Sequence, residues 1–306
     1  MDKPICIVEY DDPDMDVLRE HIEAKVLRLG LPSDQYSLTA GSSRQWEISD
    51  GESSITFDDI ERAAFIWYRR WKISPPAPAA AAPRDLGPDA GAFIERQWET
   101  TLAALLQAGY TANATKWYRA HHRRDNKILT NDLLNLLGLL PETRIALTPP
   151  LGDSEWVWKP LDADQSVGEG RAAVIAVTSA DQNVKQPCPG FYQRRVEYET
   201  ELRVAYVFGE VAAVSQQPER DIELIDKRYV DMIRAPFDSR DLTKQARRVA
   251  NAADLNMFTA DVLLDSDGRF WWIDVNQDGL FCAADSPDGH LLSAVRNQFS
   301  PKGATR

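Results

Sequence analysis

The sequence predicts a chain of the α/β class, or α+β in the wider sense. Two observations predict this class: a strand–loop–helix opening and a second half dominated by strands and hairpins. The chain has 306 residues, of which 43% are hydrophobic and 27% are charged. This length and composition are sufficient for two or three packed subdomains.

The opening segment predicts a strand, a loop and a helix. Residues 5–8 (ICIV) form a short apolar run that suits a buried strand. Residues 11–14 (DDPD) then offer capping carboxylates and a proline near a helix start. Apolar residues follow at helical spacing at Met15, Leu18, Ile22, Val26 and Leu29. The pattern predicts one helix, closed by Gly30.

The next elements are a strand, a patternless segment and two helices. Residues 64–68 (AFIWY) are a second strand candidate. Residues 74–88 are rich in proline and alanine, and they predict a flexible surface insertion. A helical pattern returns over residues 92–106. Residues 127–140 (KILTNDLLNLLGLL) predict a strongly apolar helix with a glycine and a proline at its end.

The second half is expected to be rich in strands. We predict strands at residues 156–160, 172–177, 202–208, 211–214, 258–264 and 270–275. Gly209-Glu210 is the expected two-residue turn of one hairpin, and residues 265–268 (DSDG) are the expected turn of the other. One apolar helix face repeats between the hairpins over residues 242–253.

Charge and cysteine usage limit the function classes. The net charge is −12, and such a chain repels nucleic acid unless a basic patch such as residues 119–124 overrides it. No apolar run reaches the roughly 18 residues of a membrane span, and the N-terminus turns acidic too early for a signal peptide. The cysteines Cys6, Cys188 and Cys282 show no paired spacing. We therefore expect free thiols in the cytoplasm, with neither a membrane nor a nucleic acid as partner.

Oxygen-bearing side chains gather on the last predicted hairpin. Asp261 lies on its first strand, and Asp274 and Asn276 lie two residues apart on its second. Period-two geometry points Asp274 and Asn276 to one face. Two carboxylates and an amide oxygen suit Mg²⁺, which also takes oxygens from nucleotide phosphates. The alternative is a set of solvent-facing polar residues at a hairpin end.

Two lysines and a glycine-rich loop are candidates for phosphate binding. Lys127 opens the apolar helix, and Lys159 lies near the end of the strand at residues 156–160. Each is a point charge that suits phosphate, with an ordinary solvated lysine as the alternative. The glycines of residues 164–171 would let backbone N–H groups approach a phosphate closely, with a simple hairpin loop as the alternative.

The connection after this loop supplies further candidates. Residues 192–197 (YQRRVE) form an apolar-edged connection whose backbone groups suit an adenine edge. Glu201 could accept hydrogen bonds from ribose hydroxyls. Arg203 shares a strand face with Glu201 by alternation and suits a phosphate or a substrate carboxylate. The alternative for this acid–x–arginine pair is a cross-strand surface charge pair.

The order of these candidates along the chain resembles that of a known superfamily. Six features follow one another along the chain: a helix lysine, a strand lysine, a glycine loop, a connection with glutamine, an acid–x–arginine strand and an Asp…Asp-x-Asn hairpin. In this order the chain resembles the ATP-grasp superfamily and, within it, the graspetide synthetases, the microviridin-type maturases of ribosomal peptides. The closer resemblance is carried by residues 5–18, 67–70, 126–143, 201–204, 215–216, 226–228, 261–262 and 274–279.

The resemblance implies an ATP-grasp fold in three parts. These are an N-terminal α/β domain (1–120, with the insertion at 74–88), a central subdomain (121–195) and a C-terminal β-rich subdomain (196–306). The implied ATP contacts are Lys127, Lys159, Ser166, Gly168, Gly170, Gln193, Arg195, Val196 and Glu201. The implied metal ligands are Asp261, Asp274 and Asn276. The implied catalytic residues are Arg203 and Lys159, and the implied substrate contacts are Arg69, Arg70 and Arg228.

The implied activity is that of an ADP-forming ligase that uses ATP and one or two Mg²⁺ ions. A carboxylate would become an acyl phosphate, and an amine or hydroxyl would then displace phosphate. The implied partner is a precursor peptide, whose Asp or Glu side chains would close macrocycles. A ligase for a free amino acid or small molecule and a non-catalytic ATP-binding scaffold remain alternatives, and a homodimer is left open. The non-catalytic alternative remains because Asp274 occupies a position where the superfamily usually has glutamate.

Overall fold

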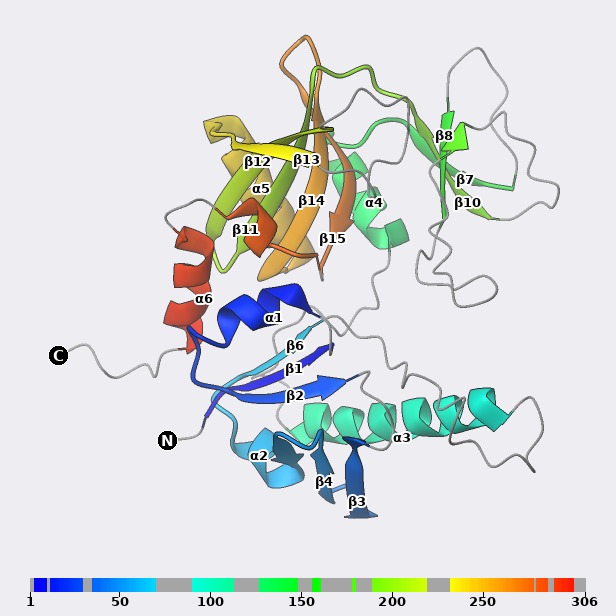
Figure 1. Ribbon diagram of the computed structural model, residues 1–306. Coiled ribbons are helices and arrows are strands. Elements are labelled where there is room, and N and C mark those ends of the chain that lie inside the picture. The colour runs from blue at the N-terminus through cyan, green and yellow to red at the C-terminus, as the bar shows by residue number, and fades with distance from the viewer. Residues whose placement is uncertain are drawn as a thin grey trace. The chain divides into compact units, whose positions relative to one another are not determined.

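The structure of the chain, a computed structural model, describes residues 3–9, 12–29, 35–69, 90–112, 127–147, 156–160, 178–179, 189–218, 232–277, 279–285 and 289–299. The chain divides into a first unit, residues 1–124 and 292–306, and a second unit, residues 125–291. No helix among the described residues combines the length and apolarity needed to cross a membrane. Each unit has its own sheets and core, which are described in turn (Figure 1).

A parallel three-stranded sheet lies at the centre of the first unit. Strand β1 (Ile5–Glu9) pairs with β2 (Lys25–Leu29) on one side and with β6 (Ile66–Arg69) on the other. Residues 5–8 are all at most 2% exposed, as expected of a parallel strand covered on both faces. The strands predicted at 5–8 and 64–68 are therefore confirmed, with the second one shifted towards Arg69.

The helix predicted from residue 13 to Gly30 is wrong, because this segment forms a helix and then a strand. Helix α1 ends at Leu18 (Pro13–Leu18), and residues 25–29 form β2. The predicted cap is confirmed, since the side chain of Asp12 accepts a hydrogen bond from the N–H of Asp14. Pairing with β1 buries Leu27 and Leu29 at a period of two, and this tertiary pairing outweighs the helical spacing of the apolar residues.

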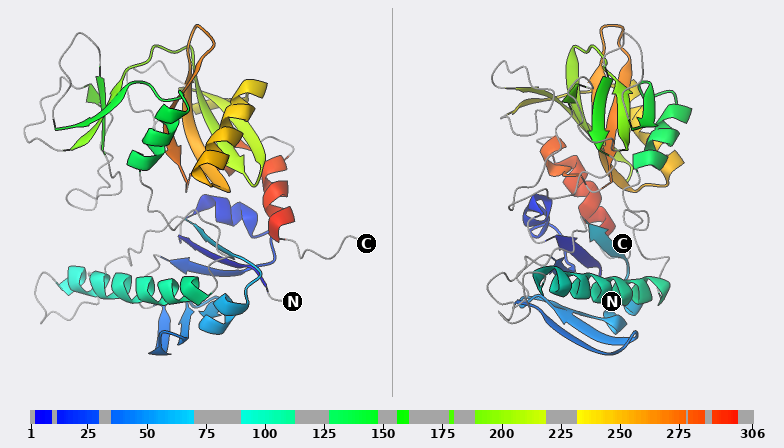
Figure 2. Two further views of the ribbon diagram at one scale, coloured as in Figure 1. Left: turned by 180° about the vertical axis from the view of Figure 1, so that it is seen from behind. Right: turned by 90° about the vertical axis from the view of Figure 1, so that its right-hand side faces the viewer.

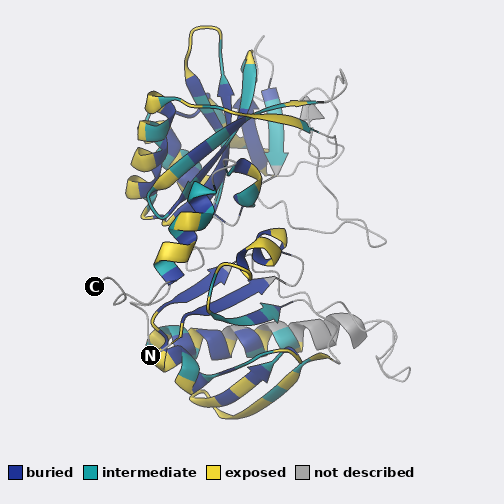
Figure 3. Ribbon diagram, turned by 60° about the vertical axis from the view of Figure 1, so that its left-hand side comes forward, coloured by how far each residue is buried: buried dark blue, intermediate teal, exposed yellow. Residues whose placement is uncertain are grey.

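A second, antiparallel sheet and two helices complete the described core of the first unit. The sequence pattern predicted helix α3 but not α2 or the strands of this sheet. The elements are β3 (Ser37–Ser42), β4 (Gln45–Ser49), β5 (Ser54–Thr56), α2 (Phe57–Arg62) and α3 (Ala90–Ala112). Leu102, Leu105 and Leu106 of α3 pack into one core with both sheets. Figure 2 shows α3 between the parallel sheet and β3–β4, and Figure 3 shows the exposed surface of β3.

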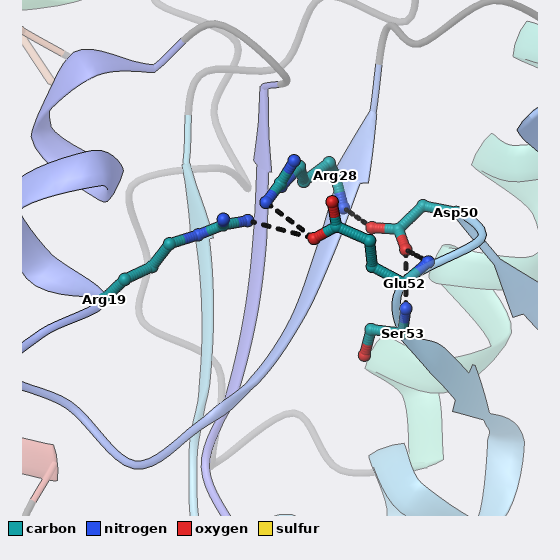
Figure 4. A network of polar contacts seen from close by, with 5 residues as sticks. All are labelled: Arg19, Arg28, Asp50, Glu52 and Ser53. Carbon is teal, nitrogen blue, oxygen red and sulfur yellow. Dashed lines mark hydrogen bonds and ion pairs between the residues drawn. The ribbon is translucent and has the colours of Figure 1, made fainter.

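A polar network joins the two sheets of the first unit (Figure 4). Asp50 is 5% exposed and accepts hydrogen bonds from the backbone N–H groups of Arg28, Glu52 and Ser53, at 2.8–3.0 Å. Glu52 pairs with Arg28 at 2.8 Å and with Arg19 at 4.0 Å. Because Arg28 lies on β2 and Asp50 follows β4, this carboxylate connects the turn of the antiparallel sheet to the edge of the parallel one.

The second unit is built on an antiparallel five-stranded sheet. Its order is β13 (Met232–Pro236), β12 (Glu210–Pro218), β11 (Thr200–Val207), β14 (Met257–Leu264) and β15 (Phe270–Asn276). Helices α4 (Lys127–Leu136) and α5 (Arg240–Ala253) lie on one face of the sheet (Figure 2). That face carries the core, in which α5 packs Leu242, Ala246 and Val249 against the strands. The predicted hairpins and both helices are confirmed, with α4 ending before Gly138.

One predicted turn is displaced by a residue. Gly209-Glu210 was the predicted turn, whereas the turn residues are Phe208 and Gly209, with φ of 48° and 101°. Val207 pairs with Glu210, so the glutamate belongs to the strand. A two-residue hairpin turn of this type needs positive φ at both central residues. Glycine occupies the second of these positions, so phenylalanine occupies the first.

A smaller antiparallel sheet completes the second unit, in the order β7 (Thr143–Ala146), β10 (Gly190–Arg194), β8 (Trp156–Pro160) and β9 (Thr178–Ser179). The strand predicted at 156–160 is confirmed, and the one predicted at 172–177 lies outside the described residues. The chain continues from β15 to a short 3-10 helix (Cys282–Ala284) and to α6 (His290–Phe299), which from residue 292 on belongs to the first unit. The sequence pattern predicted neither element.

Candidate functional site

The face of the five-stranded sheet opposite α5 carries a row of charged residues. In antiparallel strands, residues paired across the ladder point to the same face. Arg203 of β11 pairs with Asp261 of β14, which pairs with Asp274 of β15. Glu201 shares this face with Arg203, and Asn276 lies two residues further along β15, where it pairs with Thr259. The alternate residues of β11 are buried on the other face, so the alternation fixes which side chains reach the candidate site.

Two cations pair with the two aspartates of this row. Nη1 of Arg203 lies 2.7 Å from Oδ1 of Asp261, and Nζ of Lys127 lies 3.5 Å from Oδ1 of Asp274. Lys127 is the first residue of α4 and therefore approaches the sheet from a helix end. The four side chains are 23–38% exposed, so solvent screens these pairs only in part. Directly opposed carboxylates repel each other, and the two cations offset that repulsion.

Lys159 connects the smaller sheet to the larger one. Its Nζ donates hydrogen bonds to Oε1 of Gln193 on β10 and to the carbonyl oxygen of Ile273 on β15, both at 2.7 Å. Gln193 is 4% exposed, and its Nε2 donates to Oγ1 of Thr143 at 3.2 Å. Lys159 and Gln193 are therefore in direct contact, although they are 34 residues apart in the chain.

An irregularity in β15 makes the contact with Ile273 available. Asp261 pairs with Asp274, whereas the next residue of β14, Val262, pairs with Trp272. Ile273 is therefore the extra residue of a β-bulge, which the ladder leaves unpaired and which bends the strand locally. The sequence shows no signal for this bulge, so the carbonyl contact to Lys159 could not be predicted.

The remaining predicted site residues are less closely grouped or are not described. Arg195 and Val196 lie between β10 and β11, where the arginine is exposed and the valine half-buried. Arg69 ends β6, which belongs to the first unit. Ser166, Gly168, Gly170, Arg70 and Arg228 lie outside the described residues. The structure thus brings together Lys127, Lys159, Gln193, Arg203, Asp261 and Asp274 within the second unit.

Gly279 lies directly against Thr259 beside the hairpin, a contact that was not predicted. Thr259 pairs with Asn276 and is fully buried, and its hydroxyl has no hydrogen-bond partner among the described residues. A Cβ atom at Gly279 would overlap this hydroxyl and the threonine Cβ. The glycine therefore lets the chain pass directly over Thr259 as it leaves β15. The glycine after the strand was the only sequence signal for this contact.

The oxygen ligands fit a magnesium ion that is bound together with phosphate. Asp261, Asp274 and Asn276 contribute only oxygen atoms, which is the ligand type that Mg²⁺ prefers. Across the described ranges, no three His, Cys, Asp or Glu side chains form a group that could hold a metal by itself. One or two carboxylates plus phosphate oxygens are nevertheless the usual environment of Mg²⁺ in nucleotide sites.

Comparisons with known proteins identify the fold. No protein-family model matches the sequence, and no curated protein is significantly similar to it. Among solved structures, the macrocyclase MdnC from Microcystis aeruginosa MRC, bound with precursor peptide MdnA, matches with a TM-score of 0.70 and 15% identity over 97% of this chain and 99% of its own. The RiPP-associated ATP-grasp ligase of Chryseobacterium gregarium, in complex with ADP and a leader and core peptide, matches with a TM-score of 0.71 and 15% identity over 98% of each chain.

A third solved structure agrees with these two. The ATP-grasp ligase PsnB, complexed with minimal precursor, Mg and ADP, matches with a TM-score of 0.65 and 18% identity over 97% of each chain. At such identities the similarity establishes the fold alone. The similarity extends over nearly the whole length of both chains in all three cases, which confirms the predicted fold class.

Proposed function

From this ATP-grasp ligase fold, we propose that the chain is an ATP-dependent ligase that activates a carboxylate as an acyl phosphate and transfers the acyl group to a hydroxyl or amine. The observation that carries the proposal is the convergence of Lys127 and Lys159 on β15, which bears Asp274 and Asn276. Two cations from separate elements meet an all-oxygen ligand set, as a bound triphosphate requires.

The three oxygen ligands would hold Mg²⁺ against the phosphates of ATP, as one ion or two. When bound, the metal would neutralise phosphate charge and orient the phosphate chain. Support comes from the ligand chemistry of Asp261, Asp274 and Asn276 and from PsnB, the matching ligase complexed with Mg and ADP. Each of the two aspartates already lies within reach of a cation, so its charge is paired before any metal binds.

The protein residues would contribute positioning and charge. Lys127 and Lys159 would bind oxygens of the α- and β-phosphates, and Arg203 would stabilise charge on the transferred phosphoryl group. The carboxylate oxygen bonds to the γ-phosphorus while the bond to the ADP oxygen breaks. The nucleophile then bonds to the acyl carbon, loses its proton and displaces inorganic phosphate. Losing one charged contact of this kind typically costs about 10²–10³ in rate.

The nucleotide's other parts would contact the segment after β10. Backbone groups of residues 192–197, including Arg195 and Val196, would bind the adenine edge, and Glu201 would bind the ribose hydroxyls. The segment that contains Ser166, Gly168 and Gly170 would cover the β- and γ-phosphates and exclude water from the acyl phosphate. These assignments extend the contacts already described for Gln193 and Lys159.

The substrate would be a precursor peptide whose Asp or Glu side chains are joined to Ser, Thr or Lys side chains in macrocycles. Support comes from near-full-length similarity to a macrocyclase solved with a precursor peptide and to a ligase solved with a leader and core peptide. Arg69, Arg70 and Arg228 would contact the substrate carboxylates. We propose a cytoplasmic enzyme, because an acyl-phosphate reaction needs ATP and the three cysteines lack paired spacing.

An ADP-release assay with candidate acid-rich peptides tests the function, with mass spectrometry to detect the loss of water from the peptide. We expect peptide-dependent ADP release by the wild type and none by Lys159→Ala or Asn276→Ala. Lys244→Ala is the matched control, because this lysine is 74% exposed on α5 and should leave the rate unchanged. Undiminished release by either site variant contradicts the assignment. Release with free amino acids but no peptide would favour the small-molecule ligase.

A further inference from the structure

The carboxylates proposed as metal ligands are also the ion-pair partners of cations proposed as phosphate ligands. Asp274 pairs with Lys127 and Asp261 pairs with Arg203, at 3.5 Å and 2.7 Å. We propose that metal and nucleotide bind to this site as a coupled pair through an exchange of ion partners. The carboxylates pass from the cations to the metal, and the cations pass from the carboxylates to the phosphates. This inference rests on the proposed function and deepens it.

Charge balance gives the physical reason for the coupling. The two ion pairs together hold two negative and two positive side chains on adjacent elements. A divalent cation that binds alone must either share each carboxylate with the side-chain cation already paired to it or displace that cation. A displaced side-chain cation then has no other anion to pair with. A phosphate chain that binds alone faces two carboxylates and must draw Lys127 away from one of them. Binding both together restores balanced charge, so each ligand removes a cost that the other would otherwise meet.

The burial of these groups determines how strong the coupling can be. The side chains of Lys127 and Asp274 are 23% and 38% exposed, and those of Arg203 and Asp261 are 23% and 29% exposed. These ion pairs are buried enough that salt and water do not fully screen the attraction between the charges. They are also exposed enough that water can solvate a side chain that loses its partner. We therefore expect a coupling of about tenfold, near the lower end of the common range of about 5–150-fold.

Binding measurements on a variant of Lys127 separate this exchange from ordinary metal–nucleotide association in solution. Mn²⁺ serves as the paramagnetic probe, titrated alone and followed by electron paramagnetic resonance, and ADP is titrated calorimetrically with and without Mn²⁺. We expect Lys127→Met to bind Mn²⁺ alone about tenfold more tightly than the wild type, because Asp274 loses its competing cation. The factor by which Mn²⁺ raises ADP affinity should fall about tenfold. The association of Mn²⁺ with ADP in solution is the same for every variant and cancels.

Two further variants complete the design. Lys244→Met removes the same charge from the exposed pair with Asp241, at 3.3 Å, and should change neither affinity. Lys127→Gln repeats the test with a polar side chain, should the methionine variant fail to fold. Circular dichroism establishes folding for each.

The outcomes distinguish the inference from the function on which it rests. A wild type that binds Mn²⁺ and ADP together, with Lys127 variants that bind Mn²⁺ alone no more tightly than the wild type, overturns the exchange and leaves the ligase proposal intact. A folded wild type that binds ADP neither with nor without Mn²⁺ overturns both.

Discussion

Lys159 links the two sheets of the second unit, and removal of its ammonium group should be measurable as a loss of stability. Lys159→Met keeps most of the aliphatic stem and deletes the ammonium group that donates to Gln193 and Ile273 at 2.7 Å. Hydrogen bonds from a charged donor contribute about 1.5–3 kcal/mol each. The variant also leaves Oε1 of Gln193 without this donor on a side chain that is 4% exposed.

The magnitude follows from these contacts and from the burial of the lysine. Lys159 is half-buried, so relief of its desolvation cost offsets part of the loss. We expect the free energy of unfolding of the second unit to fall by about 2–3 kcal/mol. Lys127→Met, which loses one 3.5 Å pair to a carboxylate 38% exposed, should cost only about 0–1 kcal/mol. Both variants should nevertheless bind ADP more weakly than the wild type if the proposed function is right.

Urea unfolding monitored by circular dichroism, with ADP calorimetry alongside, checks this pair of variants. Equal slopes of the unfolding free energy against urea would show that the comparison concerns the same unfolding transition. The reasoning is refuted if Lys159→Met unfolds within about 0.5 kcal/mol of the wild type, because the ammonium then does not hold the sheets together. Loss of stability with unchanged ADP affinity would leave Lys159 with a structural role alone.

Three other variants test local features by urea unfolding. Although partial burial raises it, hydrogen bonds from Lys25 and Thr56 hold the pKa of Asp59 below its ordinary value. This stabilisation is complete above the ordinary pKa of aspartate and is lost as pH falls through the lowered pKa. Asp59→Asn should therefore lower the free energy of unfolding by about 1 kcal/mol at neutral pH, and this loss should shrink below about pH 4. A loss that does not change with pH contradicts this. Asp50→Ala should cost about 2–3 kcal/mol, since it leaves three backbone N–H groups without their acceptor, and a loss below 1 would contradict the role of the network. Gly279→Ala should cost about 1–3 kcal/mol by overlap with a buried threonine, and wild-type stability would argue against that close approach.

Matched controls lie elsewhere in the chain. Asp58→Asn changes the neighbouring exposed aspartate of the same helix turn. Asp267→Ala changes an exposed aspartate in a hairpin turn. Gly41→Ala places a methyl group against only the flexible side chain and backbone oxygen of Gln45. Each control should stay within about 0.5 kcal/mol of the wild type.

Local patterns were sufficient for many elements. The apolar run at residues 5–8 predicted β1, and the turn residues 265–268 predicted the last hairpin, because strand burial and turn geometry depend on neighbours in the chain. The order of lysines and carboxylates also pointed to the ATP-grasp fold before any contact was known. Helical spacing over residues 15–29 was misleading, since short apolar segments satisfy more than one periodicity.

The sequence by itself determined which residue types this protein brings to its candidate site, and in what order along the chain. Only the tertiary structure decided that Lys127 meets Asp274, that Arg203 meets Asp261 and that Lys159 reaches the carbonyl of Ile273. The last contact spans 114 residues and depends on a β-bulge. Such contacts arise from strand register and from packing between distant segments, and no local pattern of residues encodes them.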